Sequence, residues 1–148
     1  MLAKIRHLRE IVQLCQKGEP LEGDLARWLG TTLDDFLNQR ARTIEDAMGI
    51  RGPRGGVPWW MEEAIRKRDE ALRALAKHHI PESSVCAQAR RIHTLAVRYA
   101  ASSWRFDQQL DAVPLRHRNT SSEYLWLAFK SGAPMPIGER QLRNILAH

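Results

Sequence analysis

The 148-residue sequence predicts an all-α protein, a single compact bundle of five to seven helices over residues 1–148 that ends in a helical hairpin. Apolar residues recur every three or four positions along most of the chain, and no stretch alternates apolar and polar residues as a half-buried strand would. Glycine and proline clusters divide the chain into helix-length segments. A chain of this length suits one domain that buries a core without a disulfide or metal.

The first third of the chain predicts three helical segments. Residues 2–17 carry apolar side chains on one helical face and stop at a glycine. Helical periodicity then covers residues 21–40, where Gly30 weakens a helix by about 1 kcal/mol, so a break into two helices is an alternative. Thr43 and Gly49 fit the start and end of a third, short helix.

Residues 50–58 predict an irregular basic loop, because five glycines and prolines interrupt the helical period. The simplest interpretation is a helix connection whose glycines adopt positive φ. Arg51 and Arg54 offer a second interpretation, contact with nucleic-acid phosphates. A nucleotide-binding P-loop does not fit, because no strand precedes the segment and no Lys-Ser or Lys-Thr follows it.

A tryptophan pair starts the helix predicted for residues 59–78. Trp59 and Trp60 point about 100° apart on a helix. We expect one ring to anchor the loop in the core and the other to be exposed, as a stacking platform or a partner contact. Arg66 and Lys67 lie on the charged side of this helix.

The most regular pattern predicts one long helix over residues 84–111. Its apolar seam alternates steps of four and three residues, as in helical bundles. The seam comprises Val85, Ala89, Ile92, Ala96, Tyr99, Ser103, Phe106 and Leu110. Four arginines flank it: Arg90, Arg91, Arg98 and Arg105.

The C-terminal residues 122–147 predict a hairpin of two short helices that is similar to a helix-turn-helix. Arg, Gln and Asn side chains can read base edges through paired hydrogen bonds. The second helix offers Arg140, Gln141, Arg143 and Asn144 for that purpose, and Leu142, Ile145 and Leu146 for packing. Pro134 and Pro136 make the turn longer than usual, so a hairpin that only covers the bundle is the alternative interpretation.

Charge is distributed unevenly along the chain, whose formal net charge is +6. Residues 1–50 have a net charge of −1, whereas residues 51–148 carry 16 basic and 9 acidic side chains, a net charge of +7. That asymmetry favours a polyanion-facing half, although arginine-rich usage is also typical of GC-rich genomes. The predicted phosphate contacts are Arg66, Lys67, Arg90, Arg91, Arg116 and Arg118.

No motif for catalysis, a metal or a cofactor is present in the sequence. Cys86 and His93 lie about 10.5 Å apart along a helix, and neighbouring histidines diverge, so neither spacing chelates zinc. No nucleophile elbow occurs. We therefore expect no catalytic residue, metal or cofactor, and we expect Cys15 and Cys86 to be free, buried thiols.

The sequence also bears on location. The N-terminal residues lack an apolar signal-peptide core, and no run approaches the roughly 18 apolar residues of a membrane span. We therefore expect a soluble, cytoplasmic protein with no membrane partner.

The order of several segments resembles small, arginine-rich helical proteins of bacteria and prophages. These segments are GDLARWLGTTLDDFLNQRARTIEDAMGIRGPRGG, RDEALRALA, RYAASSWRFDQ and MPIGERQLRNIL. The resemblance implies a bacterial or phage setting and supplies no functional residue.

Two functions from different classes fit these observations. The first is association with DNA or RNA, as a small regulator, through the arginines named above. The second is a non-enzymatic adaptor or homo-oligomer that binds proteins through Trp59, Trp60 and exposed apolar patches.

Overall fold

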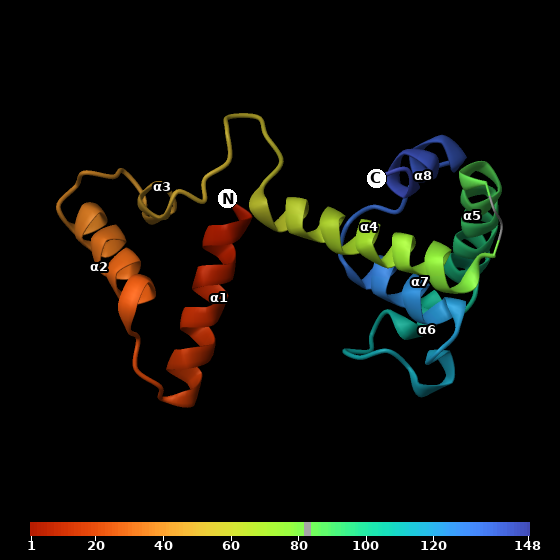
Figure 1. The fold of residues 1–148 in the computed structure, drawn as a ribbon, viewed down its shortest axis with the longest axis horizontal. Coiled ribbons are helices and arrows are strands. Elements are labelled where there is room, and N and C mark those ends of the chain that lie inside the picture. Colours follow the sequence, from red (N-terminus) through yellow and green to blue (C-terminus); the bar gives the residue numbers. More distant parts are fainter. Residues whose placement is uncertain (82–83) are drawn as a thin grey trace. The chain divides into compact units, whose positions relative to one another are not determined.

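The computed structural model describes residues 1–81 and 84–148, which form helices joined by loops (Figure 1). This part of the chain contains eight α-helices and one 3₁₀ helix, with no strand, which confirms the all-α class. By internal contacts the chain divides into two compact units, Met1–Trp60 and Met61–His148, which are described separately. The single domain stays a prediction. None of the helices described here has the length and apolar composition needed to cross a membrane.

Unit 1 contains α1 (Leu2–Lys17), α2 (Gly23–Leu37) and α3 (Ile44–Met48). The α1 helix ends at Gly18, whose φ of 69° is left-handed, as predicted. The α2 helix continues through Gly30, so the alternative with a break there is wrong.

Local side-chain chemistry explains α3. The Thr43 hydroxyl accepts a hydrogen bond from the Asp46 amide at 3.1 Å, which satisfies one of the free N–H groups at the helix start. At the other end, Gly49 has a φ of 63° and closes the helix. The predicted start and end of this helix are confirmed.

Unit 1 has a small apolar core. Its buried hydrophobic side chains are Ile5, Ile11 and Ile50. His7 of α1 meets Trp28 of α2 edge-on, with ring centroids 5.7 Å apart. Several large apolar side chains remain exposed: Val12, Leu33, Phe36, Leu37, Val57 and Trp60.

Unit 2 holds the larger core. The α4 helix (Trp59–His79) begins with the last two residues of unit 1 and contributes Leu72 and Leu75, both fully buried, to the unit 2 core. The further elements are α5 (Val85–Ala101), α6 (Trp104–Asp107), the 3₁₀ helix η1 (Leu115–His117), α7 (Ser121–Lys130) and α8 (Glu139–Leu146). Each fully buried leucine stabilises the fold by about 1.5–3 kcal/mol relative to an exposed one.

The inner face of α5 packs against its neighbours in this core. Ala89 and Ile92 are fully buried, and Leu125 of α7 and Leu142 of α8 belong to the same cluster. Tyr99 packs edge-on against Phe129 of α7, with ring centroids 5.4 Å apart. The predicted seam is therefore correct for Ala89, Ile92 and Tyr99, with Ala96 partly buried against the same cluster, but wrong for Val85, which is 39% exposed in the first turn of α5.

Beyond Ala101 the prediction of one long helix is wrong. Ser102 has φ −119° and ψ −97°, outside the helical region, and its hydroxyl donates to the Arg98 carbonyl at 2.8 Å. The chain turns here into α6, and Phe106, predicted in the seam, is 75% exposed.

The C-terminal helices lie where the sequence places them, but α8 packs mainly against α5 and not against α7. Leu142 and Ile145 are buried, as predicted. Arg73 of α4 donates to the Ile145 carbonyl at 3.1 Å and holds the end of α8. Buried Arg68 donates to the Pro134 carbonyl at 2.5 Å and holds the connection between α7 and α8.

Candidate nucleic-acid interface

The outer face of α5 is basic and carries no acidic side chain. Arg90, Arg91 and Arg98 are all exposed, and the helix sequence contains neither Asp nor Glu. At about 100° per residue, these three side chains lie within roughly 100° of arc, opposite the buried Ala89 and Ile92. Arg91 and Arg98 have no acidic partner in the described part of the chain. Their guanidinium groups are available to a polyanion.

The α8 helix adds a further arginine beside this face. Arg143 Nη1 lies 3.8 Å from the Sγ atom of Cys86, one helical turn before Arg90. Arg90 Nε lies 3.9 Å from a Glu139 carboxylate oxygen, so Arg90 is partly neutralised. The structure therefore brings together Arg90 and Arg143. It also corrects one expectation: Cys86 and Cys15 are free but exposed, because both lie on outer helix faces.

The base-reading residues proposed for α8 lie mostly on its outer face. Arg140, Arg143 and Asn144 are exposed, while Gln141 Oε1 accepts a hydrogen bond from the Ile137 amide at 3.3 Å. That bond ties Gln141 to the preceding loop. Whether this helix reads bases stays a prediction.

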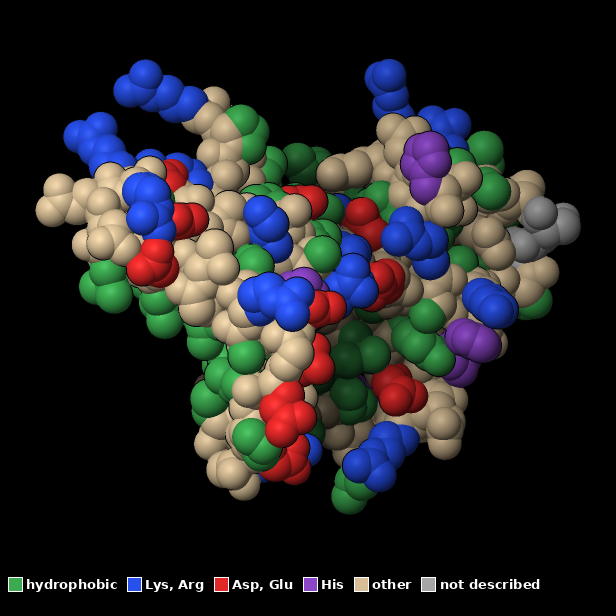
Figure 2. Space-filling view, turned by 60° about the vertical axis from the view of Figure 1, so that its left-hand side comes forward, with side chains coloured by type: hydrophobic (Ala, Val, Ile, Leu, Met, Phe, Trp, Pro, Cys, Tyr) green, Lys and Arg blue, Asp and Glu red, His purple; other side chains and the backbone are tan. Residues whose placement is uncertain are grey.

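Arg66 and Lys67 of α4 are engaged within their own helix. Arg66 lies 2.7 Å from Glu70, and Lys67 lies 3.9 Å from Glu63. Figure 2 shows the same mixture on the face that it draws, where several basic side chains adjoin acidic ones. Arg66 and Lys67 therefore contribute less net positive charge than the α5 face.

The basic loop of unit 1 contains the remaining candidates. Arg51 pairs with Asp46 at 3.1 Å, whereas Arg54 is exposed. Trp60 is 56% exposed and Trp59 is half-buried, with ring centroids 5.9 Å apart. The expected exposed ring is that of Trp60, while the anchoring of the loop in the core by Trp59 stays a prediction.

A buried carboxylate that the sequence analysis did not single out lies at the centre of unit 2. Asp107 is 1% exposed, and its Oδ2 atom lies 2.7 Å from Nε2 of His117 and 3.0 Å from the hydroxyl of Tyr99. Arg116 donates to the other carboxylate oxygen. The indole of Trp126 donates to the Asp107 carbonyl at 3.2 Å. We call Tyr99, Asp107, Arg116 and His117 the Asp107 network.

The network fixes the ionisation of Asp107. Burial alone would raise the pKa of this carboxyl, but the hydrogen bonds from His117, Arg116 and Tyr99 together lower it below its ordinary value. Burial and the bond to Asp107 raise the pKa of the Tyr99 hydroxyl, so it remains a donor. An ionised Asp107 thus holds α5, α6 and η1 together.

The network changes the role expected of Arg116. Its side chain is engaged by Asp107, so it is an internal partner as well as a surface cation. Arg118, two residues further on, is exposed. Among the predicted phosphate contacts, Arg116 is therefore an unsuitable test residue, because its removal also takes a partner from a buried charge.

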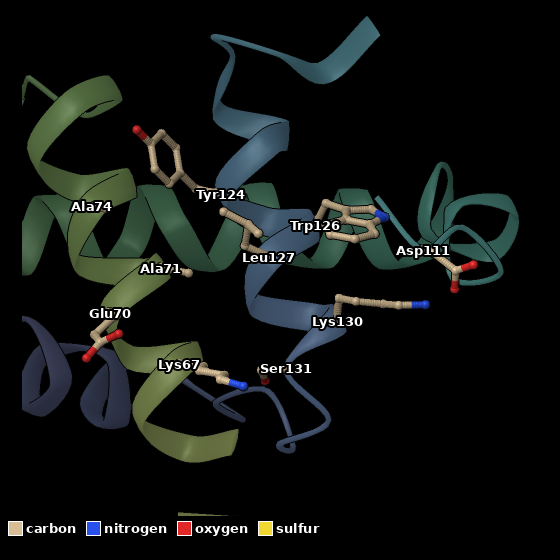
Figure 3. A pocket seen from close by; sticks show the side chains of 10 residues that line it. All are labelled: Lys67, Glu70, Ala71, Ala74, Asp111, Tyr124, Trp126, Leu127, Lys130 and Ser131. Atoms are coloured by element: carbon tan, nitrogen blue, oxygen red, sulfur yellow. The ribbon is translucent and has the colours of Figure 1, made fainter. Parts of the chain in front are cut away.

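A hollow of about 480 Å³ lies between α4 and α7, on a different part of unit 2 (Figure 3). Ala71 and Leu127 form its apolar centre, and Lys67 points into it. Its rim is of mixed charge, with Lys67, Glu70, Asp111 and Lys130. The Lys130 ammonium donates to the Gln108 carbonyl at 2.9 Å. This hollow therefore has no preference for a polyanion, and we exclude it from the interface.

Comparison with known proteins gives no further guide to the site. No protein-family model, curated protein or solved structure matches the chain. Within residues 1–81 and 84–148, no three His, Cys, Asp or Glu side chains are grouped so that they could hold a metal ion. The bacterial or phage setting, the cytoplasmic location and the lack of enzymatic activity stay predictions.

Proposed function

We propose that the protein binds nucleic acid through the outer face of α5, with Arg143 of α8 beside it. The observation that carries the proposal is the exposed set of Arg90, Arg91 and Arg98 on a helix without acidic residues. Arginine binds phosphate through paired, charge-assisted hydrogen bonds. The exposed guanidinium groups of this face offer contacts to a phosphate backbone.

The location of the charge supports a polyanion as the partner. Residues 61–148 carry 14 basic and 9 acidic side chains. One of these acids, Asp107, is buried and accepts hydrogen bonds from three side chains. Phosphate contacts release counterions, so affinity should fall steeply as salt increases. The exposed Arg140 and Asn144 next to this face would approach bases, which would add sequence preference.

The decisive test is a fluorescence titration against random duplex DNA and single-stranded RNA at about 50 and about 200 mM salt. We expect the wild-type protein to bind at the lower salt concentration. In the double variant Arg91→Ala with Arg98→Ala, the slope of log affinity against log salt concentration should be smaller in magnitude by about 2. Complete absence of binding at low salt would reject the proposal, since non-specific attraction would already be measurable.

A matched control uses an exposed arginine of unit 1. Arg42→Ala removes one unit of charge, as the single variant Arg91→Ala does, but lies outside unit 2. We expect its effect to be much smaller. Equal losses for Arg42→Ala and Arg91→Ala would show that total charge, and not the α5 face, determines binding.

Unit 1 supports a second candidate function, protein binding or self-association. Ile5, Leu8, Val12 and Trp59 line a hollow of about 390 Å³ along α1, and Trp60 is exposed nearby in sequence. Exposed apolar surface of this kind is typical of interaction sites. Light scattering across a concentration series, with Trp60→Ala compared with wild type, tests it. A monomer at every concentration that also captures no partner would count against it.

A further inference from the structure

Two exposed apolar side chains lie on the two segments that the Asp107 network joins. Asp107 binds Arg116 and His117, so α6 and η1 are joined side by side. The residues that immediately precede the bonded groups, Phe106 and Leu115, are 75% and 76% exposed. Leaving such side chains in water forgoes the favourable free energy that their burial would contribute. The core contacts of this region come instead from Trp104 and Val113.

Arginines flank this apolar pair. Arg105 adjoins Phe106 in sequence, Arg118 follows His117, and both are exposed. The negative charge of Asp107 is directed inward to Tyr99, His117 and Arg116 and is buried, so it does not neutralise the outer guanidinium groups. We name Arg105, Phe106, Leu115 and Arg118 the Phe106 surface.

The Phe106 surface follows directly on the basic face of α5. The α5 helix ends at Ala101 and α6 begins at Trp104, so the chain passes from Arg98 to Arg105 within seven residues. We therefore take the Phe106 surface as the continuation of the α5 face for a bound strand.

We propose that the Phe106 surface stacks an unpaired base, so that the preferred ligand is single-stranded DNA or RNA. This inference rests on the proposed function and adds the class of nucleic acid. An exposed aromatic ring beside guanidinium groups can stack a base and bind its phosphate, whichever the sequence. The bases of a duplex already stack on one another, so a ring on the protein surface adds little to duplex binding.

An anionic membrane surface is the competing occupant, because exposed Phe and Leu beside arginines also suit a lipid interface. Single-stranded nucleic acid is favoured because the outer face of α5 is mainly cationic. Arg90, Arg91 and Arg98 are exposed there beside polar Thr94, and Val97 is the large apolar side chain exposed among them. Vesicles of phosphatidylserine and phosphatidylcholine provide the test of this alternative.

The experiment compares affinities by fluorescence anisotropy. The ligands are labelled single strands of DNA and RNA of about 16 nucleotides, within the range that single-strand modules cover, and a duplex of the same sequence. The proteins are wild type, Phe106→Ala, Phe106→Tyr and the control Ile137→Ala, which truncates a side chain that is 93% exposed elsewhere in unit 2. Circular dichroism melts check that all four are folded.

We expect Phe106→Ala to weaken single-strand binding about fivefold or more, the lower limit for loss of one base–aromatic stack, and to leave duplex binding nearly unchanged. Phe106→Tyr retains a ring and should bind like wild type, and Ile137→Ala should change neither affinity. Equal losses on single strand and duplex, or no loss, would overturn the stacking inference while nucleic-acid binding itself stands. Loss confined to vesicle binding would assign the surface to membranes, and absence of all nucleic-acid binding would remove both proposals.

Discussion

His117 and Asp107 form a buried pair in which Nε2 of the imidazole lies 2.7 Å from Oδ2 of the carboxylate. The two residues come from η1 and α6, and the pair also receives the Tyr99 hydroxyl of α5. A buried carboxylate without such donors would be neutral at physiological pH. The pair therefore fastens the segment between α6 and α7 to α6.

The first prediction concerns Asp107→Asn. The change removes the negative charge from beside three donors, and we expect a loss of about 3–5 kcal/mol in the free energy of unfolding at pH 7. Urea denaturation measures it. The control is Asp111→Asn, an exposed acid four residues away, for which we expect a change within about 0.5 kcal/mol.

The same variant should reveal the pH dependence of the network. Because the native pKa of Asp107 is lowered, the carboxylate stabilises the fold above its unfolded pKa of about 3.9. That contribution is lost as the pH falls below this value and through the native pKa. We expect the difference in Tm between wild type and Asp107→Asn to shrink in that range. A difference that stays constant down to the lowest pH at which both fold would contradict the assignment.

Arg68 provides a second test of buried polar contacts. Arg68→Met keeps the apolar stem but removes the hydrogen bond to the Pro134 carbonyl and the ion pair with Asp69. We expect a loss of about 1.5–3 kcal/mol, as for hydrogen bonds that involve charged groups. Arg66→Met, next to it on α4 and paired at the surface, should cost less than about 1 kcal/mol. Similar chemical-denaturation midpoints for the two variants would rule out this difference.

The packing of α5 can be tested by enlarging its smallest core residue. Ala89 is fully buried, so Ala89→Leu should overpack the core and cost about 1–3 kcal/mol. Ala100→Leu places the same side chain on the exposed side of the helix and should change stability little. Thermal melts distinguish them. A melting temperature of Ala89→Leu equal to wild type would mean that α5 does not pack as described.

The start of α5 depends on one hydroxyl. Ser84 accepts a hydrogen bond from the Ala87 amide at 3.1 Å, and Ser84→Ala should destabilise the fold by about 1 kcal/mol. Hydrogen exchange in the first turn of α5 should rise with it. Ser84→Asp restores an acceptor and should recover most of the loss; failure to recover would argue against capping.

The sequence predicted the helices whose ends carry local chemistry. Thr43 and Gly49 define α3 through a cap and a left-handed residue, and the spacing of Leu142 and Ile145 defines the buried face of α8. These signals depend only on neighbouring residues. They survive in the fold because tertiary contacts do not oppose them.

The end of α5 was missed because neither glycine nor proline marks it. Ser102 leaves the helix through a hydroxyl-to-carbonyl bond that sequence periodicity does not encode. After Ser103 the helical period allows the seam to continue at Phe106 or at Asp107, three or four residues further on. The prediction of Phe106 was wrong, because Phe106 is exposed and Asp107 is buried. The signal that could have identified the network is Asp107, an acid at a possible seam position within reach of the hydroxyl of Tyr99, because a buried tyrosine hydroxyl usually has a hydrogen-bond partner.

The sequence indicated which residue types could form the candidate interface, but not which of these side chains are free of acidic partners. Arg90, Arg91, Arg116 and Arg118 were equivalent in the sequence, yet Arg116 binds a buried carboxylate nine residues away. Pairing of this kind depends on a turn between α6 and η1, which composition does not reveal. The α5 face became distinctive only when its helix proved to be free of acids and its outer side exposed.

The packing of α8 against α5 has a consequence for synthesis. The inner face of α5 is complete once Ala101 has been made, but Leu142 and Ile145 follow more than 40 residues later. At about 5–20 residues per second, that interval lasts roughly 2–9 s. During this time the part of α5 that packs against α8 is uncovered in the growing chain, so unit 2 cannot finish folding until α8 has left the ribosome. Translation speed and early chaperone contact, and not only final stability, should then decide how much of the protein reaches the folded state.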